Sequence, residues 1–322
     1  MSTQIVQRVF GGPETLEVVD VTPPSAADVG PDEVLVRVAA AGVNQIDVMT
    51  RTGGGMAAAG IITLPYTPGW DVAGIVEAVG SAVAGLSPGQ RVLGLARFPK
   101  PGSAYAEHVI IPAADLVPAP ENLSDDQAAA LPMAAMTAWQ AFTDTTAVQP
   151  GQRVLITGAG GGVGHLAVQL AHHLGARVIA VASSGKHEWL RELGADETVD
   201  YRDGDAIDAL AGMVDVTLSL AAGSRDTALR AVRTGGTLIA LGGGAEGLEA
   251  AAKQAGVGFA ATHVHTQRDW LTAIADLAAH GVLVPTVSEV FDLADAADAH
   301  RAIESGHSTG KIVLRTNSRL GS

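Results

Sequence analysis

The sequence contains no cysteine among its 322 residues, which excludes disulfide bonds and thiolate metal sites. Positive charge is also scarce, because 20 lysines and arginines stand against 34 acids and leave a net charge of −14. Nucleic acids and anionic membranes bind positive surfaces, so neither is expected as a partner. No apolar run is long enough to cross a membrane, and the first residues lack the apolar core of a secretory signal. These absences predict a soluble, cytoplasmic protein.

The apolar residues are sufficient for large cores. Hydrophobic residues make up 47% of the chain, and its length favours two domains. Short β-branched runs bounded by Gly, Pro and Asp predict strands at 34–38, 74–79 and 91–95. Residues 51–60 read as a loop. Ser124 and Gln127 form a capping-box pattern, so a helix is expected to begin there.

Strands and helices alternate from residue 153 to about residue 266. Regular alternation predicts an α/β fold with a doubly wound parallel sheet. The tail returns to the character of the first part, with strands expected at 287–291 and 311–314. We therefore predict a domain of residues 119–266 inserted between residues 1–118 and 267–322.

A glycine-rich turn at 158–164 is the most informative segment. It connects the apolar run 154–157 to a helical pattern that begins at once. Glycines there let the chain turn tightly and let a pyrophosphate reach the N–H groups at the helix start. The first glycine of the strict fingerprint is replaced by Ala159. We predict dinucleotide binding at Gly161, Gly162, Val163 and Gly164.

The end of the next strand, 177–182, bears on the choice of cofactor. NAD-specific sheets place an acid there to hold the ribose hydroxyls. Here the strand is followed by Ser183, Ser184 and Lys186, with no acid. Hydroxyl donors and a cation suit a phosphate, so NADPH is the expected cofactor.

Several segments, in this order, resemble the medium-chain dehydrogenase/reductase superfamily, zinc-independent quinone oxidoreductase branch. They are residues 42–47, 64–74, 131–139, the glycine turn and 306–314. The resemblance implies a GroES-like β-barrel catalytic domain, a Rossmann domain, and a cleft between them for nicotinamide and substrate. The glycine turn and residues 190–196 also resemble the enoyl reductase domains of polyketide synthases.

The resemblance also locates the zinc positions of metal-dependent relatives. Those relatives have Cys, His and Cys where this chain has Asn44, Trp70 and Met133. These three side chains cannot build the Cys/His site that zinc needs, so no metal site is predicted.

The resemblance implies roles for further residues. It places Asn44 and Thr137 near the nicotinamide and its ribose, and Tyr201 over the 2′-phosphate. Asn44 offers amide donors to the reaction or serves as a turn residue. Tyr66 either donates to the acceptor oxygen or packs beside two prolines, and water is a third source of the proton. Asp47 is interpreted as an anchor for the Asn44 loop. Further cofactor contacts are predicted at Leu241, Gly242 and Gly243.

These features predict a zinc-independent, NADPH-dependent reductase of quinones or α,β-unsaturated carbonyls. One alternative is an enoyl reductase acting on a thioester or biosynthetic intermediate. Another is an NADPH-binding protein with a structural or regulatory role and little turnover. The family further implies a homodimer in which two copies of residues 258–265 pair as edge strands.

Overall fold

The computed structural model describes residues 1–241, 247–262 and 264–316, which form two compact units. The first unit comprises Met1–Met133 and His265–Ser322, and the second comprises Ala134–Val264. The domain limits expected from the sequence, at residues 119 and 266, stay a prediction.

The first unit is built on a seven-stranded sheet in the order β14-β15-β3-β4-β5-β7, with β6 also paired to β3. A separate antiparallel hairpin is formed by β1 and β2. The strands are β1 (Ser2–Gln7), β2 (Leu16–Val21), β3 (Glu33–Val43), β4 (Asp71–Val79), β5 (Arg91–Leu95), β6 (His108–Pro112), β7 (Leu116–Pro118), β14 (Val287–Asp292) and β15 (Lys311–Arg315).

Short helices connect and cover these strands. The α-helices of this unit are α1 (Gln45–Arg51), α2 (Gly55–Ala58), α3 (Asp125–Ala130), α10 (Arg268–Ala279) and α11 (Ala296–Glu304), and α4 (Pro132–Trp139) runs on into the second unit. The 3-10 turns are η1 (Pro13–Thr15), η2 (Ala26–Asp28), η3 (Ala113–Asp115) and η8 (Leu293–Asp295).

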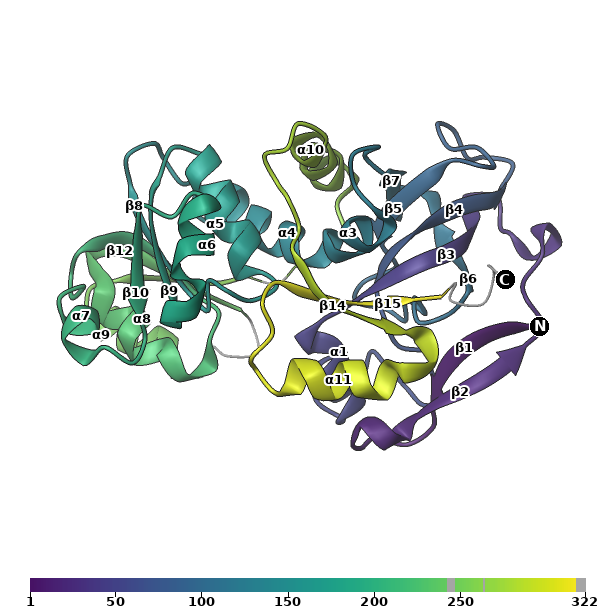
Figure 1. Ribbon diagram of the computed structural model, residues 1–322, viewed down its shortest axis with the longest axis horizontal. Helices are drawn as coiled ribbons and strands as arrows, with labels where there is room; N and C mark the ends of the chain where they lie inside the picture. Colours follow the sequence, from purple (N-terminus) through teal and green to yellow (C-terminus); the bar gives the residue numbers. More distant parts are fainter. Residues whose placement is uncertain (242–246, 263, 317–322) are drawn as a thin grey trace. The chain divides into compact units, whose positions relative to one another are not determined.

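The end of the chain completes the sheet that its beginning starts. In Figure 1 the yellow strand β15 lies beside the purple strand β3, and the two pair antiparallel from Ile312 with Val43 to Arg315 with Ala40. Alternate residues Val34, Val36 and Val38 of β3 point into the core. The expected strands at 287–291 and 311–314 are thus confirmed, and they belong to the first unit.

Two local predictions have different outcomes. Ser124 accepts a hydrogen bond from the Gln127 N–H, so the expected capping box at the start of α3 is confirmed. The loop expected at 51–60 is wrong in part, because it contains α2. Gly54 O accepts from two amides of that turn, and methionine and alanine favour a helix there.

The second unit is a six-stranded parallel sheet in the order β10-β9-β8-β11-β12-β13. Its strands are β8 (Arg153–Thr157), β9 (Arg177–Ala182), β10 (Glu197–Asp200), β11 (Val214–Ser219), β12 (Val232–Leu241) and β13 (Gly258–Thr262). Its helices and turns are η4 (Gln140–Thr145, a π-helix), α5 (Gly164–His173), η5 (Ser184–Lys186), α6 (His187–Glu192), α7 (Gly204–Asp208), η6 (Ala222–Ser224), α8 (Arg225–Ala231) and α9 (Leu248–Gln254). This order confirms the predicted doubly wound sheet.

The strand order positions a binding site. The chain runs outward from β8 through α5 to β9, and in the opposite direction from β11 through α8 to β12. Because parallel crossovers are right-handed, the two sets of helices cover opposite faces. The order reverses between β8 and β11, where the Thr157 hydroxyl accepts the Leu220 N–H at 3.1 Å. Ligands of such sheets bind at this reversal, beyond the carboxyl ends of the strands.

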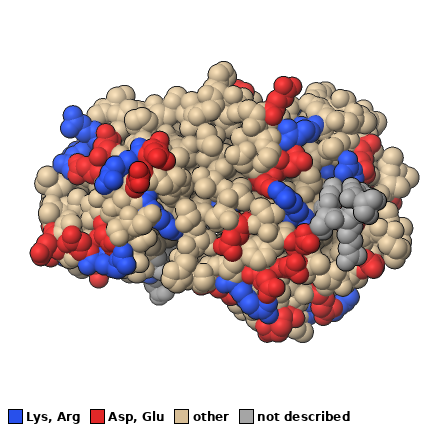
Figure 2. All heavy atoms as spheres, viewed as in Figure 1, with Lys and Arg blue, Asp and Glu red and all other residues tan. Residues whose placement is uncertain are grey.

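Charged side chains of both signs lie close together on the surface. On the face drawn in Figure 2, Lys and Arg are interspersed with Asp and Glu over each unit. This mixture differs from the continuous positive surface that polyanions bind. Among the described residues, no helix is long and apolar enough to cross a membrane.

Candidate functional site

The glycine turn lies between β8 and α5, at the reversal point of the sheet. Gly158 has φ +65°, and a Cβ on Gly164 would lie 2.3 Å from the Gly158 carbonyl oxygen, so both positions require glycine. A Cβ on Gly161 would meet only that oxygen, at 3.4 Å. The turn is therefore closed on its inner side and open at Gly161, as a pyrophosphate cradle needs to be.

Histidine at the start of α5 holds the turn in place. His165 is fully buried, its Nδ1 lies 3.0 Å from the Gly161 carbonyl oxygen, and its ring stacks on Trp189. The predicted residues Gly161, Gly162, Val163 and Gly164 are thus brought together at one helix N-terminus.

The residues predicted to hold the phosphate follow β9. Ser183 is extended, and Ser184 and Lys186 form the turn η5. The Lys186 side chain lies against the glycine turn, because a Cβ on Gly160 would be 2.5 Å from its Cδ and 3.4 Å from its Nζ. Burial lowers the pKa of Lys186. The Lys186 side chain therefore lies beside the glycine turn, and its role in holding a phosphate stays a prediction.

Although no acid follows β9 in the sequence, the neighbouring strand β10 brings one to this position. Asp200 ends β10 opposite Ala182, the last residue of β9. Its Oδ2 accepts the Ser184 N–H at 2.9 Å. A search along β9 misses this carboxylate because it comes from the adjacent parallel strand. Tyr201 follows it and is 60% exposed.

The remaining predicted cofactor contacts are more scattered. Thr137 lies on α4 and is buried, and Leu241 ends β12 opposite Thr262. Gly242 and Gly243 lie outside the described residues. Taken with the open cradle and Lys186, the described residues fit a dinucleotide that carries a phosphate on its ribose. The assignment of individual contacts stays a prediction.

In the first unit, Asn44 is held by two charged residues. It follows β3, and its Nδ2 donates to Asp71 Oδ2 at 2.8 Å while its Oδ1 accepts from Lys311 Nζ at 2.5 Å. Lys311 also donates to the Val43 carbonyl at 2.9 Å and lies 3.4 Å from Asp71 Oδ2. The ammonium therefore has an acceptor for each of its three hydrogens, although Lys311 is 3% exposed and Asp71 fully buried.

Asp71 is held on its other side as well. Its Oδ1 accepts the Met133 N–H at 2.8 Å. Burial raises the pKa of Asp71, while the Lys311 ammonium and the Asn44 amide act in the opposite direction. We call Asn44, Asp71 and Lys311 the amide clamp. Within it, one Nδ2 hydrogen of Asn44 has no partner among the residues the structure describes.

Asp47 anchors the start of α1, as expected from the sequence. Its Oδ2 accepts the Asn44 N–H at 2.7 Å and the Tyr105 hydroxyl at 3.3 Å. Burial raises the pKa of Asp47 to about 7, and the Asp71 charge adds to the rise.

A chain of hydrogen bonds leads from Asp47 to a buried arginine. The Tyr105 hydroxyl lies 3.1 Å from His300 Nε2, and Arg51 Nη1 lies 3.4 Å from His300 Nδ1. Because a guanidinium only donates, Nδ1 accepts and Nε2 carries the hydrogen. Burial and the Arg51 charge lower the pKa of His300 to about 3, so His300 is neutral. In this series of hydrogen bonds Arg51 donates to His300, His300 donates to Tyr105, and Tyr105 donates to Asp47.

Tyr66 lies inside the first unit. Its backbone pairs with Gln7, and its hydroxyl is buried with no partner among the described residues. Burial raises the pKa of Tyr66, with the Asp47 charge adding to the effect. The side chain is 7% exposed, so Tyr66 is packed inside the first unit, while its role as a proton donor stays a prediction.

The residues at the three zinc positions do not fit zinc. The Trp70 indole donates to the Lys100 carbonyl at 2.7 Å, and the Met133 backbone N–H donates to Asp71 of the amide clamp. At the remaining position, the Asn44 amide oxygen is bound to the Lys311 ammonium. A thioether, an indole and an amide bound to a cation offer no tetrahedral Cys/His set.

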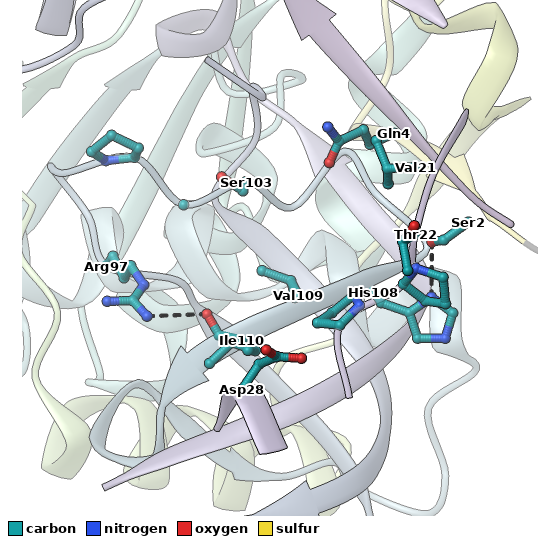
Figure 3. Close-up of a pocket in the computed structure, with 14 residues that line it drawn as sticks. Ser2, Gln4, Val21, Thr22, Asp28, Arg97, Ser103, His108, Val109 and Ile110 are labelled. Carbon is teal, nitrogen blue, oxygen red and sulfur yellow. Dashed lines mark hydrogen bonds between the residues drawn. The ribbon is translucent and has the colours of Figure 1, made fainter. Parts of the chain in front are cut away.

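A pocket of about 680 Å³ lies elsewhere in the first unit. Figure 3 shows Arg97, Ser103 and His108 in its wall, with Arg97 bonded to the Ile110 carbonyl and His108 to Ser2. None of the predicted site residues that the structure describes lines this pocket. It is therefore separate from both groups of candidate residues.

Sequence reasoning missed Lys311 and Asp71 in the amide clamp, and Asp200 and Arg202 beside Ser184. A lysine opening an apolar strand, Lys311 to Leu314, was a usable signal, because a charged residue in a core strand needs buried partners. No comparable signal marks Asp200, since its partner Ser184 is sixteen residues earlier in the chain.

The chain is similar to dehydrogenases and reductases over both units. A family model described as the alcohol dehydrogenase GroES-like domain matches residues 30–121. A second, described as zinc-binding dehydrogenase, matches residues 193–314. The quinone oxidoreductase structure from Coxiella burnetii is 32% identical, with a TM-score of 0.90 over 98% of this chain and 100% of that one. The GroES-like and Rossmann fold class is thereby confirmed.

Two curated relatives differ in how much of their length is matched. NADPH-dependent alkenal/one oxidoreductase of Arabidopsis thaliana is 34% identical over 292 residues, which cover 88% of this chain and 72% of the relative. Spectinabilin polyketide synthase system protein NorB of Streptomyces orinoci is 36% identical over 304 residues. The match covers 91% of this chain but 13% of NorB.

Titration of Asp47 should make the stability of the chain fall as the pH rises. Burial raises its pKa from 3.8 to about 7, so between these values the folded chain binds a proton that the unfolded chain releases. The stability that protonated Asp47 contributes is therefore fully present below about pH 4. It is lost as the pH rises toward about 7. Asp47→Asn should reduce this slope.

Urea unfolding at about pH 5 and about pH 8 measures the slope. Asp298→Asn on the surface of α11 serves as the control, since its side chain is 60% exposed. An Asp47→Asn slope equal to that of the parent chain would contradict the assignment.

Proposed function

Because the chain belongs to the medium-chain dehydrogenase/reductase superfamily, in its quinone oxidoreductase branch, we propose that it transfers hydride from NADPH to a quinone or an α,β-unsaturated carbonyl without zinc. The amide clamp carries the proposal: the Lys311 ammonium binds Asn44 and lies beside Asp71, among the positions where zinc-dependent relatives bind their metal. A small-molecule substrate and a cytoplasmic location are parts of the same proposal.

The second unit binds the cofactor in this proposal. The open glycine turn accepts the pyrophosphate, and Lys186 and Ser184 lie on the side where β9 ends. When bound, NADPH supplies the hydride from its nicotinamide ring. The remaining requirement is a donor that stabilises negative charge on the acceptor.

Asn44 meets this requirement through its remaining Nδ2 hydrogen. The Lys311 ammonium draws electron density from the amide oxygen, which makes the amide N–H a stronger donor. A single amide donor offers modest stabilisation, far less than a metal Lewis acid. An acceptor that spreads the charge into an enolate or a hydroquinone anion therefore suits this site better than an isolated ketone.

Enoyl reduction of a thioester or a biosynthetic intermediate is the second candidate. It is favoured by the 36% identity to NorB across 91% of this chain. An enoyl thioester also places the developing charge on a conjugated oxygen, so the same donor serves both reactions.

An acceptor panel tests the proposed chemistry. With NADPH, a quinone and an enone should be reduced faster than a saturated ketone of similar size, because only the conjugated acceptors delocalise the charge. NADPH oxidation followed by absorbance measures the rates, and an enoyl thioester in the same panel distinguishes the second candidate. Fastest reduction of the saturated ketone would refute the proposal, and oxidation of NADPH with none of the acceptors would favour a binding protein.

Removing the Asn44 amide should slow turnover. Asn44→Ala should lower kcat by about tenfold or more, because a preorganised donor to a developing oxyanion is lost. The double variant Lys311→Met/Asp71→Asn should lower kcat similarly, since it leaves Asn44 without its clamp while removing both buried charges together. Adding Asn44→Ala to that double variant should cost little more, because the three residues act as one unit.

Steady-state kinetics with the quinone measures these effects. Arg91→Met/Asp125→Asn is the matched control, because it removes an ion pair of the same unit from outside the clamp. Additive losses across the series would show that Lys311 and Asp71 do not act through Asn44. Thermal unfolding of every variant checks that each one is folded.

Lys186 should contribute to the choice of cofactor. Lys186→Ala should weaken NADPH by about ten- to a hundredfold and NADH much less, because one charge-assisted bond to phosphate is lost. Fluorescence titration of both cofactors measures the two affinities. Equal loss for the two would show that Lys186 does not contact the phosphate.

A homodimer is proposed from the free edge of the parallel sheet. β13 is the last strand in the order and pairs with β12 alone among the described strands. Exposed edges of this kind favour pairing with a second copy. Light scattering at micromolar concentration should give twice the chain mass. Ala261→Lys, at an exposed position of β13, should shift the chain toward monomer, and a monomeric parent chain would contradict the proposal.

A further inference from the structure

The acid beside the candidate phosphate site creates an electrostatic difficulty. Asp200 Oδ2 accepts the Ser184 N–H at 2.9 Å, so a phosphate bound by Ser184 would lie close to a carboxylate. Hydrogen bonds from Arg202 hold the pKa of Asp200 well below its usual range, so this carboxylate stays ionised. An uncompensated acid here would favour a ribose hydroxyl over a phosphate, as it does in NAD-specific sheets.

Arg202 neutralises this acid and fixes its own position by doing so. Its Nε donates to Asp200 Oδ1 at 2.9 Å and its Nη2 to Asp200 Oδ2 at 2.6 Å, which is a two-pronged pair. The Arg202 backbone N–H donates to Oδ1 as well, at 2.9 Å. The guanidinium is thus held rigidly at the end of β10, beside the residues that follow β9.

The same guanidinium reaches the serine. Arg202 Nη2 lies 3.4 Å from Ser184 Oγ, and its Cζ lies 5.5 Å from the centre of the Tyr201 ring. Its Nη1 group has no hydrogen-bond partner among the residues the structure describes, and the side chain is 59% exposed. A solvent-facing pair of N–H donors next to a serine hydroxyl is the geometry that binds a phosphate oxygen.

We propose that Arg202 determines selectivity for the phosphorylated cofactor by supplying a second cation to the 2′-phosphate and by screening Asp200. The proposal rests on the proposed use of NADPH and adds a residue that the sequence did not indicate. Lys186 lies in the turn after β9, against the glycine turn, and Arg202 follows β10, so the phosphate would be bound between two cations that follow different strands. Without Arg202, the Asp200 carboxylate, which is 17% exposed, would repel the phosphate and accept a ribose hydroxyl instead.

Nucleotide fragments test this proposal without any turnover. Adenosine 2′,5′-bisphosphate carries the distinguishing phosphate, and adenosine 5′-monophosphate lacks it. Arg202→Ala should weaken the bisphosphate by about ten- to a hundredfold in titration calorimetry, and should leave the monophosphate unchanged. The double variant Arg202→Ala/Asp200→Asn should recover part of the loss, because the repelling charge is gone.

Arg230→Ala is the matched control. Arg230 also forms an ion pair with an acid of the second unit, Asp208, and its side chain is 58% exposed. Removing it should change neither affinity. Equal weakening of both nucleotides by Arg202→Ala, or no weakening at all, would overturn the role of Arg202.

The affinities of the parent chain for the two nucleotides distinguish failure of the Arg202 proposal from failure of the NADPH preference on which it rests. A parent chain that binds both nucleotides equally would overturn the NADPH preference and the role of Arg202 together. A parent chain that prefers the bisphosphate, with an Arg202→Ala variant that keeps the full preference, would overturn only the role of Arg202. Loss of preference in Arg202→Ala with partial recovery in the double variant would support both.

Discussion

The buried ammonium of Lys311 is the constraint around which the first unit is organised. A charge removed from water must be fully hydrogen-bonded, and losing one partner of a buried pair costs about 3–5 kcal/mol. Three acceptors meet this need: the Val43 carbonyl, Asn44 and Asp71. They come from β3, the residue after it, and β4, whereas Lys311 opens β15. The end of the chain is therefore tied to its beginning by electrostatics as well as by strand pairing.

This constraint has a chemical consequence. Asp71 and Lys311 bind the Asn44 side chain from its two ends, so the amide cannot rotate without breaking one of the two bonds. A donor fixed before the reaction needs no reorganisation when charge develops nearby. The zinc of metal-dependent relatives carries positive charge, and here the positive charge is the Lys311 ammonium, which contacts Asn44. Under the proposed function, such a donor suits acceptors that delocalise their own charge.

Much of the fold could be predicted from the sequence because its signals are local. The strand–turn–helix at 154–171 and the capping box at Ser124 depend on residues that are close in sequence, and both are present. The short helix α2 was missed because glycines on both sides outweigh the helical preference of Met56 to Ala58. The Ser183–Lys186 segment follows β9 as a turn, while its contact with the phosphate stays a prediction.

The charge partners of the candidate site could not be predicted in this way. Lys311 is 267 residues from Asn44, and Asp200 is sixteen residues from Ser184, so each pairing depends on strand order. The alternation of strands and helices indicates a parallel sheet, but it does not place one particular side chain beside another. The register of the strands determines which side chains meet. Asp200 lies opposite Ala182, and a shift of one residue would turn its carboxylate to the other face of the sheet.

The cofactor preference can then be understood as a balance of charges at one sheet edge. Two unit charges about 4 Å apart interact by about 1 kcal/mol in water and about 4 kcal/mol near a protein surface. At the proposed site, Asp200 would oppose a phosphate by an amount of this order, and Lys186 and Arg202 would each favour it by a similar amount. With both cations present the sum is attractive. With Lys186 alone it is close to zero, because one cation and one acid nearly cancel. A single arginine would therefore decide between two cofactors at the proposed site.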